Sequence, residues 1–219
     1  MEHGIVYSSA SGWLPPENGF VRGMPPEVYH SYNDGLSSNG AKLVLQSPAH
    51  WKRRDAEETD ALRFGRIMHT ALLEPKHFRR WFITPPEFKG EGSKKAKAEW
   101  LAAQPSAAII LKNMEEQVRI TDMVQEILNH KYAVNLLKTG IAEISGFWTD
   151  RETGVKCRFR PDYLRASSLG PMVLDYKTTR SAQYQDFSRS AYNLGYPLSA
   201  AWYSEGIFQV TGQKCGGVI

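Results

Sequence analysis

Asp162, Asp175 and Lys177 are the residues of this chain whose types and spacing best suit chemistry. Asp162 lies in a segment of alternating polar and apolar residues, 156–163. Asp175 and Lys177 lie in a second apolar segment, 173–179. Side chains of a strand alternate between its two faces, so Asp175 and Lys177 are expected to project together. A hairpin that turns at residues 167–171 would bring both carboxylates and the ammonium group into one cluster.

Such a cluster has a known chemical use and an ordinary alternative. Two carboxylates supply oxygen ligands for Mg²⁺ and leave positions for water and a substrate phosphate. The metal lowers the pKa of bound water, and a nearby lysine orients that water or stabilises the charged transition state. The alternative is a cross-strand salt bridge on a solvated sheet face, because Asp-x-Lys pairs are common. Arg160-Pro161-Asp162, followed after a loop by an apolar run into Asp-x-Lys-Thr-Thr, favours the metal site.

These residues resemble the signature of the PD-(D/E)XK nuclease superfamily, a Pro-Asp followed after a variable gap by Asp or Glu-x-Lys. More closely, the chain resembles the phage exodeoxyribonuclease VIII (RecE-type) branch, and the likeness covers most of its length. Residues 47–51 (Ser-Pro-Ala-His-Trp) are similar to the N-terminal Ser-Pro element of that branch. Residues 64–75 are similar to its Gly-x-x-x-His helix with a Leu-Glu-Pro ending.

The resemblance implies a fold and an activity. The fold is α/β, with a central mixed β-sheet flanked by helices in a restriction-endonuclease-like core. The implied activity is hydrolysis of DNA phosphodiesters with Mg²⁺, for which Mn²⁺ can substitute, by an end-dependent duplex exonuclease of phage recombination. The implied partners are double-stranded DNA, a single-strand annealing protein and further copies in a homo-oligomeric ring. The implied location is the cytoplasm of a bacterial host of a phage or prophage.

The resemblance also assigns roles to residues. His69, Asp162 and Asp175 are the predicted metal ligands, and Lys177 completes the catalytic set. A lone histidine on a half-buried helix is usually structural, but the match of Gly65 and His69 to the family motif reverses that expectation. Glu143 is a further acidic candidate near the metal, and a surface strand position is an equal alternative.

A second group of residues is predicted to contact nucleic acid. Two of its members have open alternatives: a serine at 37 or 38 could instead cap a helix, and the arginines could instead form salt bridges with nearby acids. At the glutamine of the family's Gln-x-x-x-Tyr element this chain has Ser199, a departure that bears on substrate contact more than on metal binding. The predicted nucleic-acid contacts are Ser38, Arg158, Arg160, Thr178 and Tyr203.

The amino-acid composition limits the classes of protein to which this chain can belong. The chain has 219 residues, 42% of them hydrophobic and 23% charged, which is ordinary for one globular domain. The net charge of +4 permits a polyanionic partner without requiring one. Two cysteines exclude a disulfide framework and a four-cysteine iron–sulfur cluster, and they favour an intracellular setting. No apolar run approaches a membrane span and no signal peptide is visible, so no membrane partner is expected.

The pattern along the chain predicts the domain organisation and the elements. Residues 1–30 are expected to be an arm or loop, and residues 31–219 a single nuclease domain that lacks the family's C-terminal end. Helices are expected over 36–51 with a stop before Pro48, and over 59–73, 94–104, 114–128, 183–194 and 196–208, with a short one reaching 137. Strands are expected from 81, over 143–148, and in the two segments that carry the acids. Lys94, Lys95 and Lys97 are candidates for contacts with a DNA backbone.

Two rival functions remain open. The first is an endonuclease or repair nuclease on the same core, which would cut closed circular DNA. The second is a DNA-binding recombination accessory protein whose catalysis is weakened by Ser199. The presence of both aspartates and the lysine argues against the second, since a binding protein needs no paired carboxylates facing phosphates.

Overall fold

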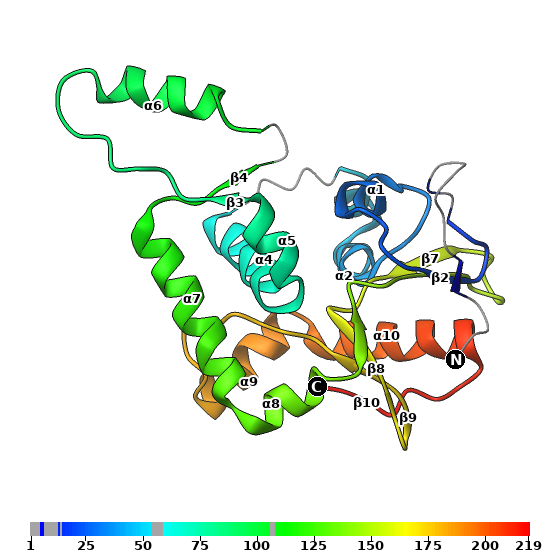
Figure 1. The fold of residues 1–219 in the computed structure, drawn as a ribbon. Helices are drawn as coiled ribbons and strands as arrows, with labels where there is room; N and C mark the ends of the chain where they lie inside the picture. The colour runs from blue at the N-terminus through cyan, green and yellow to red at the C-terminus, as the bar shows by residue number, and fades with distance from the viewer. Residues whose placement is uncertain (1–4, 7–12, 14, 54–58, 106–107) are drawn as a thin grey trace. The chain divides into compact units, whose positions relative to one another are not determined.

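The fold is a mixture of helices and short strands in two compact units, seen here in a computed structural model (Figure 1). The structure describes residues 5–6, 13, 15–53, 59–105 and 108–219. The first unit is formed by Met1–Glu57 and Leu136–Ile219, and the second by Glu58–Asn135. In the described part of the chain, no helix has both the length and the apolar character needed to cross a lipid bilayer.

The strands of the first unit form two four-stranded sheets. One has the order β1 (Ile5–Val6), β2 (Gly19–Val21), β6 (Ser145–Thr149), β7 (Lys156–Phe159). The other has the order β10 (Gly217–Val218), β9 (Gly170–Leu174), β8 (Tyr163–Ser167), β5 (Gly140–Ala142). Each sheet contains one parallel pair, β1 with β2 and β10 with β9, and its other pairs are antiparallel. The α/β class with mixed sheet and flanking helices is confirmed, and the strands of the first unit are divided between two sheets.

The two sheets are joined by one bent pair of strands. The pairs Ala142↔Tyr163 and Gly146↔Phe159 keep a single register across the bend. The connection from β5 to β6 therefore lies opposite the connection from β7 to β8. Pro161 lies at the bend and has no N–H to donate to a ladder. Glu143, opposite the bend, has φ of 52°. The strand expected over 156–163 is therefore interrupted immediately before Asp162.

The hairpin predicted between the two acidic segments is present as β8 and β9. Ser167 Oγ donates to Gly170 O (2.7 Å) and accepts from Leu169 N (3.2 Å), which closes the turn. Gly170 has φ of 108°, a conformation that glycine adopts without strain. The strand β9 ends at Leu174, so residues 175–179 leave the sheet instead of continuing the expected strand.

The described part of the N-terminal segment is not the arm that the sequence predicts. β2 pairs with β6, and helix α1 (Pro26–Ser31) follows it. A three-residue strand is too short to show a period, and its Gly- and Pro-rich surroundings resemble a loop. Burial shows instead that this segment belongs to the core; its buried side chains are Phe20, Val21, Met24 and Tyr29.

A single helix was expected over 36–51, and the structure has two. Helix α2 (Ser38–Gln46) is capped by Ser37, whose Oγ accepts from Gly40 N at 3.2 Å. Ser47 then caps α3 (Pro48–Lys52) by accepting from Ala49 N at 3.2 Å. The helix-ending effect expected of Pro48 is thus present, but proline at the first position of a helix also starts a new one.

Helix α10 (Tyr196–Thr211) packs against strands of both sheets: β2, β6 and β7 of one and β10 of the other. Helix α9 (Tyr184–Asn193) precedes it. Ile207 of α10 is fully buried against Phe159, and Trp202 Nε1 donates to Arg158 O at 3.0 Å. The α10 helix therefore fixes the position of β7, the strand that leads to Pro161 and Asp162.

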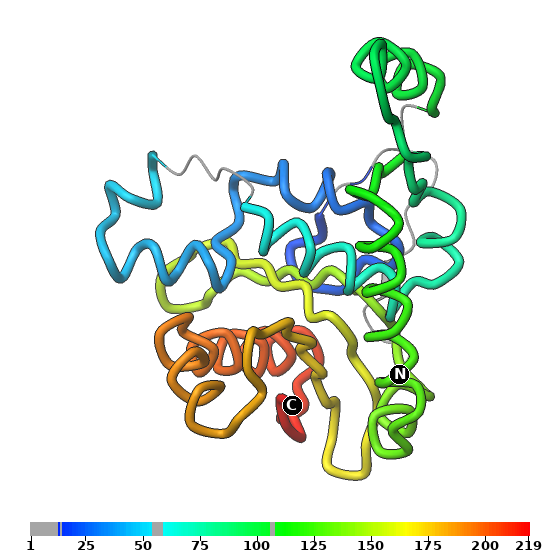
Figure 2. Tube along the Cα trace, turned by 90° about the vertical axis from the view of Figure 1, so that its left-hand side faces the viewer, coloured from blue at the N-terminus to red at the C-terminus, as the bar shows by residue number. Residues whose placement is uncertain are grey.

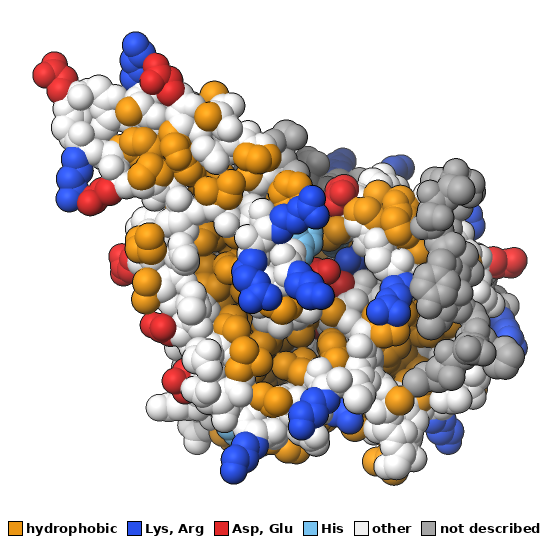
Figure 3. Space-filling view, viewed as in Figure 1, with side chains coloured by type: hydrophobic (Ala, Val, Ile, Leu, Met, Phe, Trp, Pro, Cys, Tyr) orange, Lys and Arg blue, Asp and Glu red, His pale blue; other side chains and the backbone are white. Residues whose placement is uncertain are grey.

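The second unit contains α4 (Asp60–Leu73), α5 (Pro75–Trp81), β3 (Phe82–Ile83), α6 (Ser93–Ala102), β4 (Ile109–Ile110) and α7 (Met114–Asn129). Helix α8 (Lys131–Leu136) spans the boundary. The helix predicted over 59–73 is confirmed, with Thr59 as its cap. Along the α6 segment, where Phe88 contacts Trp100, hydrophobic side chains gather on the surface in Figure 3, and Lys94, Lys95 and Lys97 are exposed.

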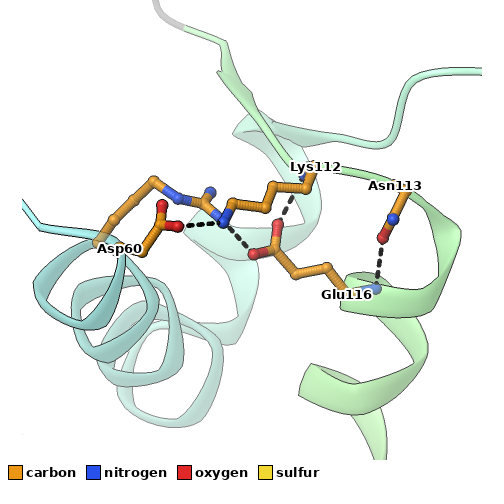
Figure 4. Close-up of polar contacts among 5 residues, drawn as sticks. Asp60, Lys112, Asn113 and Glu116 are labelled. Atoms are coloured by element: carbon orange, nitrogen blue, oxygen red, sulfur yellow. Dashed lines mark hydrogen bonds and ion pairs between the residues drawn. The ribbon is translucent and has the colours of Figure 1, made fainter.

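A polar network joins the first turns of α4 and α7 (Figure 4). Lys112 Nζ lies 2.7 Å from Asp60 Oδ2, while Lys112 N donates to Glu116 Oε2 at 2.7 Å. Glu116 also pairs with Arg63, and its backbone N–H donates to the cap residue Asn113 at 2.9 Å. The carboxylate of Glu116, in the first turn of α7, thus links α7 to α4.

A substitution at Gly146 would test how closely the core of the first unit is packed. It lies directly across from Phe159 in the strand pair, and a Cβ at Gly146 would overlap the Phe159 ring. We expect Gly146→Ala to lower the free energy of unfolding by roughly 1–3 kcal/mol through overpacking, as measured by denaturant titration. The same change in a Phe159→Leu background should cost less, because the ring is gone. Equal losses in both backgrounds would contradict this packing.

Candidate active site

Three carboxylates occupy one row across three neighbouring strands. Glu143 directly follows β5, Asp162 directly precedes β8, and Asp175 directly follows β9. The adjacent row consists of Ala142, Tyr163 and Leu174, which are paired in that order. Glu143 N donates to Asp162 O at 3.0 Å, and carboxylate oxygens of the same two residues lie within 4.8 Å of each other. The sheet register alone therefore brings together acids that are separated by many residues in the sequence.

Lys177 contacts two of these acids. Its Nζ lies 2.5 Å from Asp175 Oδ1 and 3.8 Å from Asp162 Oδ2. The Asp162 residue is only 8% exposed, and Asp175 and Lys177 are partly buried. The backbone holds Asp175 as well, because Asp175 N donates to Ile219 O at 2.8 Å. The structure thus brings together the Asp162, Asp175 and Lys177 side chains that the sequence singles out, although residues 175–179 lie outside the strand.

The charges of the cluster shift the pKa values of its members. Burial, followed by the negative charge of Asp162, raises the pKa of Asp175, and Lys177 opposes this. Burial lowers the pKa of Lys177, but the charges of Asp162 and Asp175 outweigh it, so the net direction is upward. Lys177 is therefore held as an ammonium group at neutral pH. It can donate hydrogen bonds and stabilise negative charge, but it cannot act as a general base.

The two arginines before Pro161 are used inside the fold. Arg160 Nε donates to Glu143 Oε2 at 2.7 Å, and its Nη1 donates to Met24 O at 2.9 Å. Arg158 is buried; its guanidinium donates to Tyr29 O and lies 4.7 Å from the centre of the Tyr29 ring. For Arg160 the structure has the salt bridge that was the alternative to a phosphate contact. The predicted phosphate contact of Arg158 is at odds with its burial, since the guanidinium would have to leave Tyr29.

Helix α10 supplies the neighbours of the acidic row. Burial, followed by the charges of Asp175 and Asp162, raises the pKa of Tyr203, so its phenol stays neutral. Ser199, one helical turn earlier, is 6% exposed. Lys177 Nζ lies 5.7 Å from the centre of the Tyr196 ring. The Tyr203 ring also packs against the core through Phe159, so the predicted contact of Tyr203 with nucleic acid stays a prediction.

Three predicted residues remain, Ser38, Thr178 and His69. Ser38 is the buried first residue of α2, and its neighbour Ser37 is the cap. Thr178 is partly buried in the segment after β9. His69 lies in α4 of the second unit, within the helix predicted for it, and stays a predicted ligand.

Sequence reasoning undervalued Glu143 and missed Lys42. Glu143 was predicted as the first residue of a strand, and its place opposite Asp162 becomes visible only through the register of the sheet. Lys42 lies on α2, and its pKa responds to both Asp175 and Lys177. An isolated lysine on an amphipathic helix carries no sequence signal of such a neighbourhood.

The acidic row has the donor set that a hard divalent cation prefers. Glu143, Asp162 and Asp175 offer carboxylate oxygens, the usual protein ligands of Mg²⁺. Burial and then the charge of Asp162 raise the pKa of Asp175, so holding both aspartates ionised is unfavourable. A cation bound among them would relieve that repulsion. These residues therefore fit a metal site made of oxygen ligands.

The α/β fold and the Pro-Asp and Asp-x-Lys residues at the open end of a hairpin define a domain of the PD-(D/E)XK class. The chain belongs to the family described as PDDEXK-like domain of unknown function (DUF3799), whose model matches residues 37–219. The superfamily predicted from the motifs is thus confirmed, and the fold is of nuclease type. The family description does not name the RecE-type branch. A search of curated proteins gave no match.

The raised pKa of Asp175 predicts a pH dependence of stability. The folded protein binds a proton at Asp175 at higher pH than the unfolded chain, whose value is near 3.8. This contribution to stability is therefore fully present below the unfolded pKa and is lost as the pH rises through the folded pKa. Without divalent metal, we expect the unfolding free energy of the wild type, relative to Asp175→Asn, to rise as the pH falls from 7 to 4.

Asp122→Asn is the matched control, because it removes an exposed carboxylate from α7. The difference in unfolding free energy between the wild type and Asp122→Asn should change much less from pH 7 to pH 4. If the difference in unfolding free energy between the wild type and Asp175→Asn did not change with pH, burial and Asp162 would not perturb this carboxyl group.

Proposed function

We propose that this protein is a metal-dependent deoxyribonuclease that hydrolyses phosphodiester bonds with Mg²⁺ or Mn²⁺. The observation that carries the proposal is the contact of one ammonium group, Lys177 Nζ, with the carboxylates of Asp175 and Asp162. The contact lies where the register also places Glu143. A nuclease-type fold supports the same reading.

A structural salt bridge on a solvated face does not account for this arrangement. Asp162 is buried and Lys177 is mostly enclosed. Burying charges costs several kcal/mol per ion, roughly, and the attraction of one pair repays this only with excellent geometry. The two carboxylates held on one ammonium group also repel each other, which adds to the cost. A site that binds a cation and a phosphate has a use for these charged groups.

The residues have distinct roles in this proposal. Asp162, Asp175 and Glu143 hold the cation, and His69 is a further ligand proposed from its family motif alone. When bound, the cation neutralises charge on the phosphoryl group and provides a nucleophile at neutral pH. Lys177, kept protonated by its two carboxylates, donates to oxygen atoms that gain negative charge in the transition state. Arg160 holds the Glu143 carboxylate through its 2.7 Å ion pair.

The finer assignment is an end-dependent exonuclease of the RecE type that acts on duplex DNA in phage recombination. The support is the combination of the Gly65-to-His69 helix and the Ser47-Pro48 element with the nuclease motifs. Double-stranded DNA, a single-strand annealing protein and a ring of several copies belong to this proposal. An endonuclease on the same core is the second candidate, since the acidic row would serve either enzyme.

Lys177→Ala tests the catalytic role. We expect the variant to keep its fold and metal binding and to lose about 100-fold to 1,000-fold in kcat, because it lacks a preorganised charge worth roughly 3 kcal/mol in the transition state. Lys156→Ala is the control, since Lys156 is an exposed lysine of the same unit. Hydrolysis is measured on duplex DNA, and folding is checked by circular dichroism. Near-normal turnover would exclude Lys177 from this role.

Linear and covalently closed circular duplexes of the same sequence separate the two candidate activities. With Mg²⁺, we expect degradation of the linear form only, and with EDTA no cleavage of either. Asp175→Asn serves as the inactive control, because it removes a carboxylate of the row. Efficient nicking of closed circles would favour the endonuclease. Metal-independent cleavage, or equal cleavage by Asp175→Asn, would contradict the nuclease proposal itself.

A further inference from the structure

A groove in the first unit is lined by residues of α2 and of the turn that joins α9 to α10. Figure 2 shows the backbone of these segments. The cavity of the groove measures about 520 Å³, which falls in the range of roughly 300–1,000 Å³ typical of ligand sites. Tyr192, Leu45 and Leu194 line it and are 80%, 75% and 56% exposed. Exposed apolar side chains that share a concave surface are a feature of binding sites.

Lys42 connects this groove to the acidic row. Its aliphatic chain runs past Gly195, where an added Cβ would lie 3.1 Å from Lys42 Cε, and its Nζ donates to Asn39 Oδ1 at 3.3 Å. Burial lowers the pKa of Lys42, and it is further influenced by Asp175 and Lys177. The α10 residue after Gly195 is Tyr196, whose ring faces the Lys177 ammonium. The cationic end of the groove is therefore a close neighbour of the site.

The lining combines three kinds of group that suit one class of ligand. An exposed tyrosine and leucines offer apolar surface on which a base can stack. Amide side chains, which hydrogen-bond to the edges of bases, are supplied by Asn39, Gln46 and Asn193. Lys42 adds a point charge suited to a phosphate. A purely apolar protein segment would make no use of the lysine and the amides.

We propose that this groove binds one unpaired nucleotide of the DNA strand, next to the phosphodiester cleaved at the acidic row. The base lies against Tyr192, and its phosphate is bound by Lys42. This inference rests on the proposed nuclease function and adds a substrate contact that the nuclease motifs do not specify. It assigns the groove to single-stranded DNA, which a strand leaving a duplex end provides.

The test is the affinity of the full chain for a short fluorescent single-stranded oligodeoxynucleotide, measured by anisotropy in EDTA so that binding is read without cleavage. Tyr192→Ala should bind roughly tenfold more weakly through lost stacking, and Tyr192→Phe should bind like the wild type. Lys42→Gln should weaken binding and lower the slope of log Kd against log salt by about 0.7.

The controls lie in the same unit but outside the groove. Tyr184→Ala removes a tyrosine of α9 that is 85% exposed, and Lys156→Gln removes an exposed lysine of β7. Both should bind like the wild type. Wild-type affinity in Tyr192→Ala and Lys42→Gln overturns the inference and leaves the leucines as a surface for another protein chain. Equal losses in the controls also overturn it.

Cleavage separates this inference from the proposed function. If the wild type cuts DNA with Mg²⁺ and the groove variants bind and cut equally well, the groove inference fails alone. If the groove variants lose oligonucleotide binding while no cleavage occurs with any divalent metal, the nuclease proposal fails, and only the binding of single-stranded DNA in the groove stands.

Discussion

The contact of Lys177 Nζ with both Asp162 and Asp175 is the interaction on which the site depends. Carboxylates held close together inside a protein repel each other, and their desolvation adds to the cost. The fold offsets part of this cost with two cations, Lys177 on the aspartates and Arg160 on Glu143. In the described part of the first unit, these pairs set two cations against three carboxylates. Negative charge gathered in this way suits the divalent cation that the proposed function requires.

The backbone achieves this arrangement by making three strands end or bend in the same row. Pro161 interrupts the strand before Asp162, Glu143 adopts a positive φ opposite it, and Asp175 follows the last residue of β9. Regular strands would have kept the backbone of these positions within a continuous ladder of hydrogen bonds. Because the register is continuous through the bend, Glu143 and Asp162 stay opposite each other where the strand pair passes from one sheet to the other. The same interruption that divides the sheet therefore creates the site.

The sequence predicted what depends on local patterns. The hairpin, the helix of His69 and the meeting of Asp162 with Asp175 and Lys177 follow from alternation, capping and motif spacing. It did not predict that Gly19–Val21 would form a strand, because a short strand has no measurable period. This strand is stabilised by its pairing with Ser145–Thr149, which lies far away in the sequence. The burial of Arg158 was missed for a related reason. Its partner, Tyr29, lies 129 residues away, and no local pattern reports such a contact.

The face of α10 toward the row explains what the Ser199 departure changes. Tyr196, Ser199 and Tyr203 are spaced by three and four residues and so share one side of the helix. Tyr196 lies against the Lys177 ammonium, and the pKa of Tyr203 responds to the aspartates. A glutamine at 199 would extend toward Lys177 and the aspartates. The shorter serine side chain does not extend as far, so other residues would have to make that contact. The carboxylates themselves are fixed by strands, not by α10. In the proposed function, Ser199 therefore bears on the contact with substrate, while the strands still hold the carboxylates of the proposed metal site.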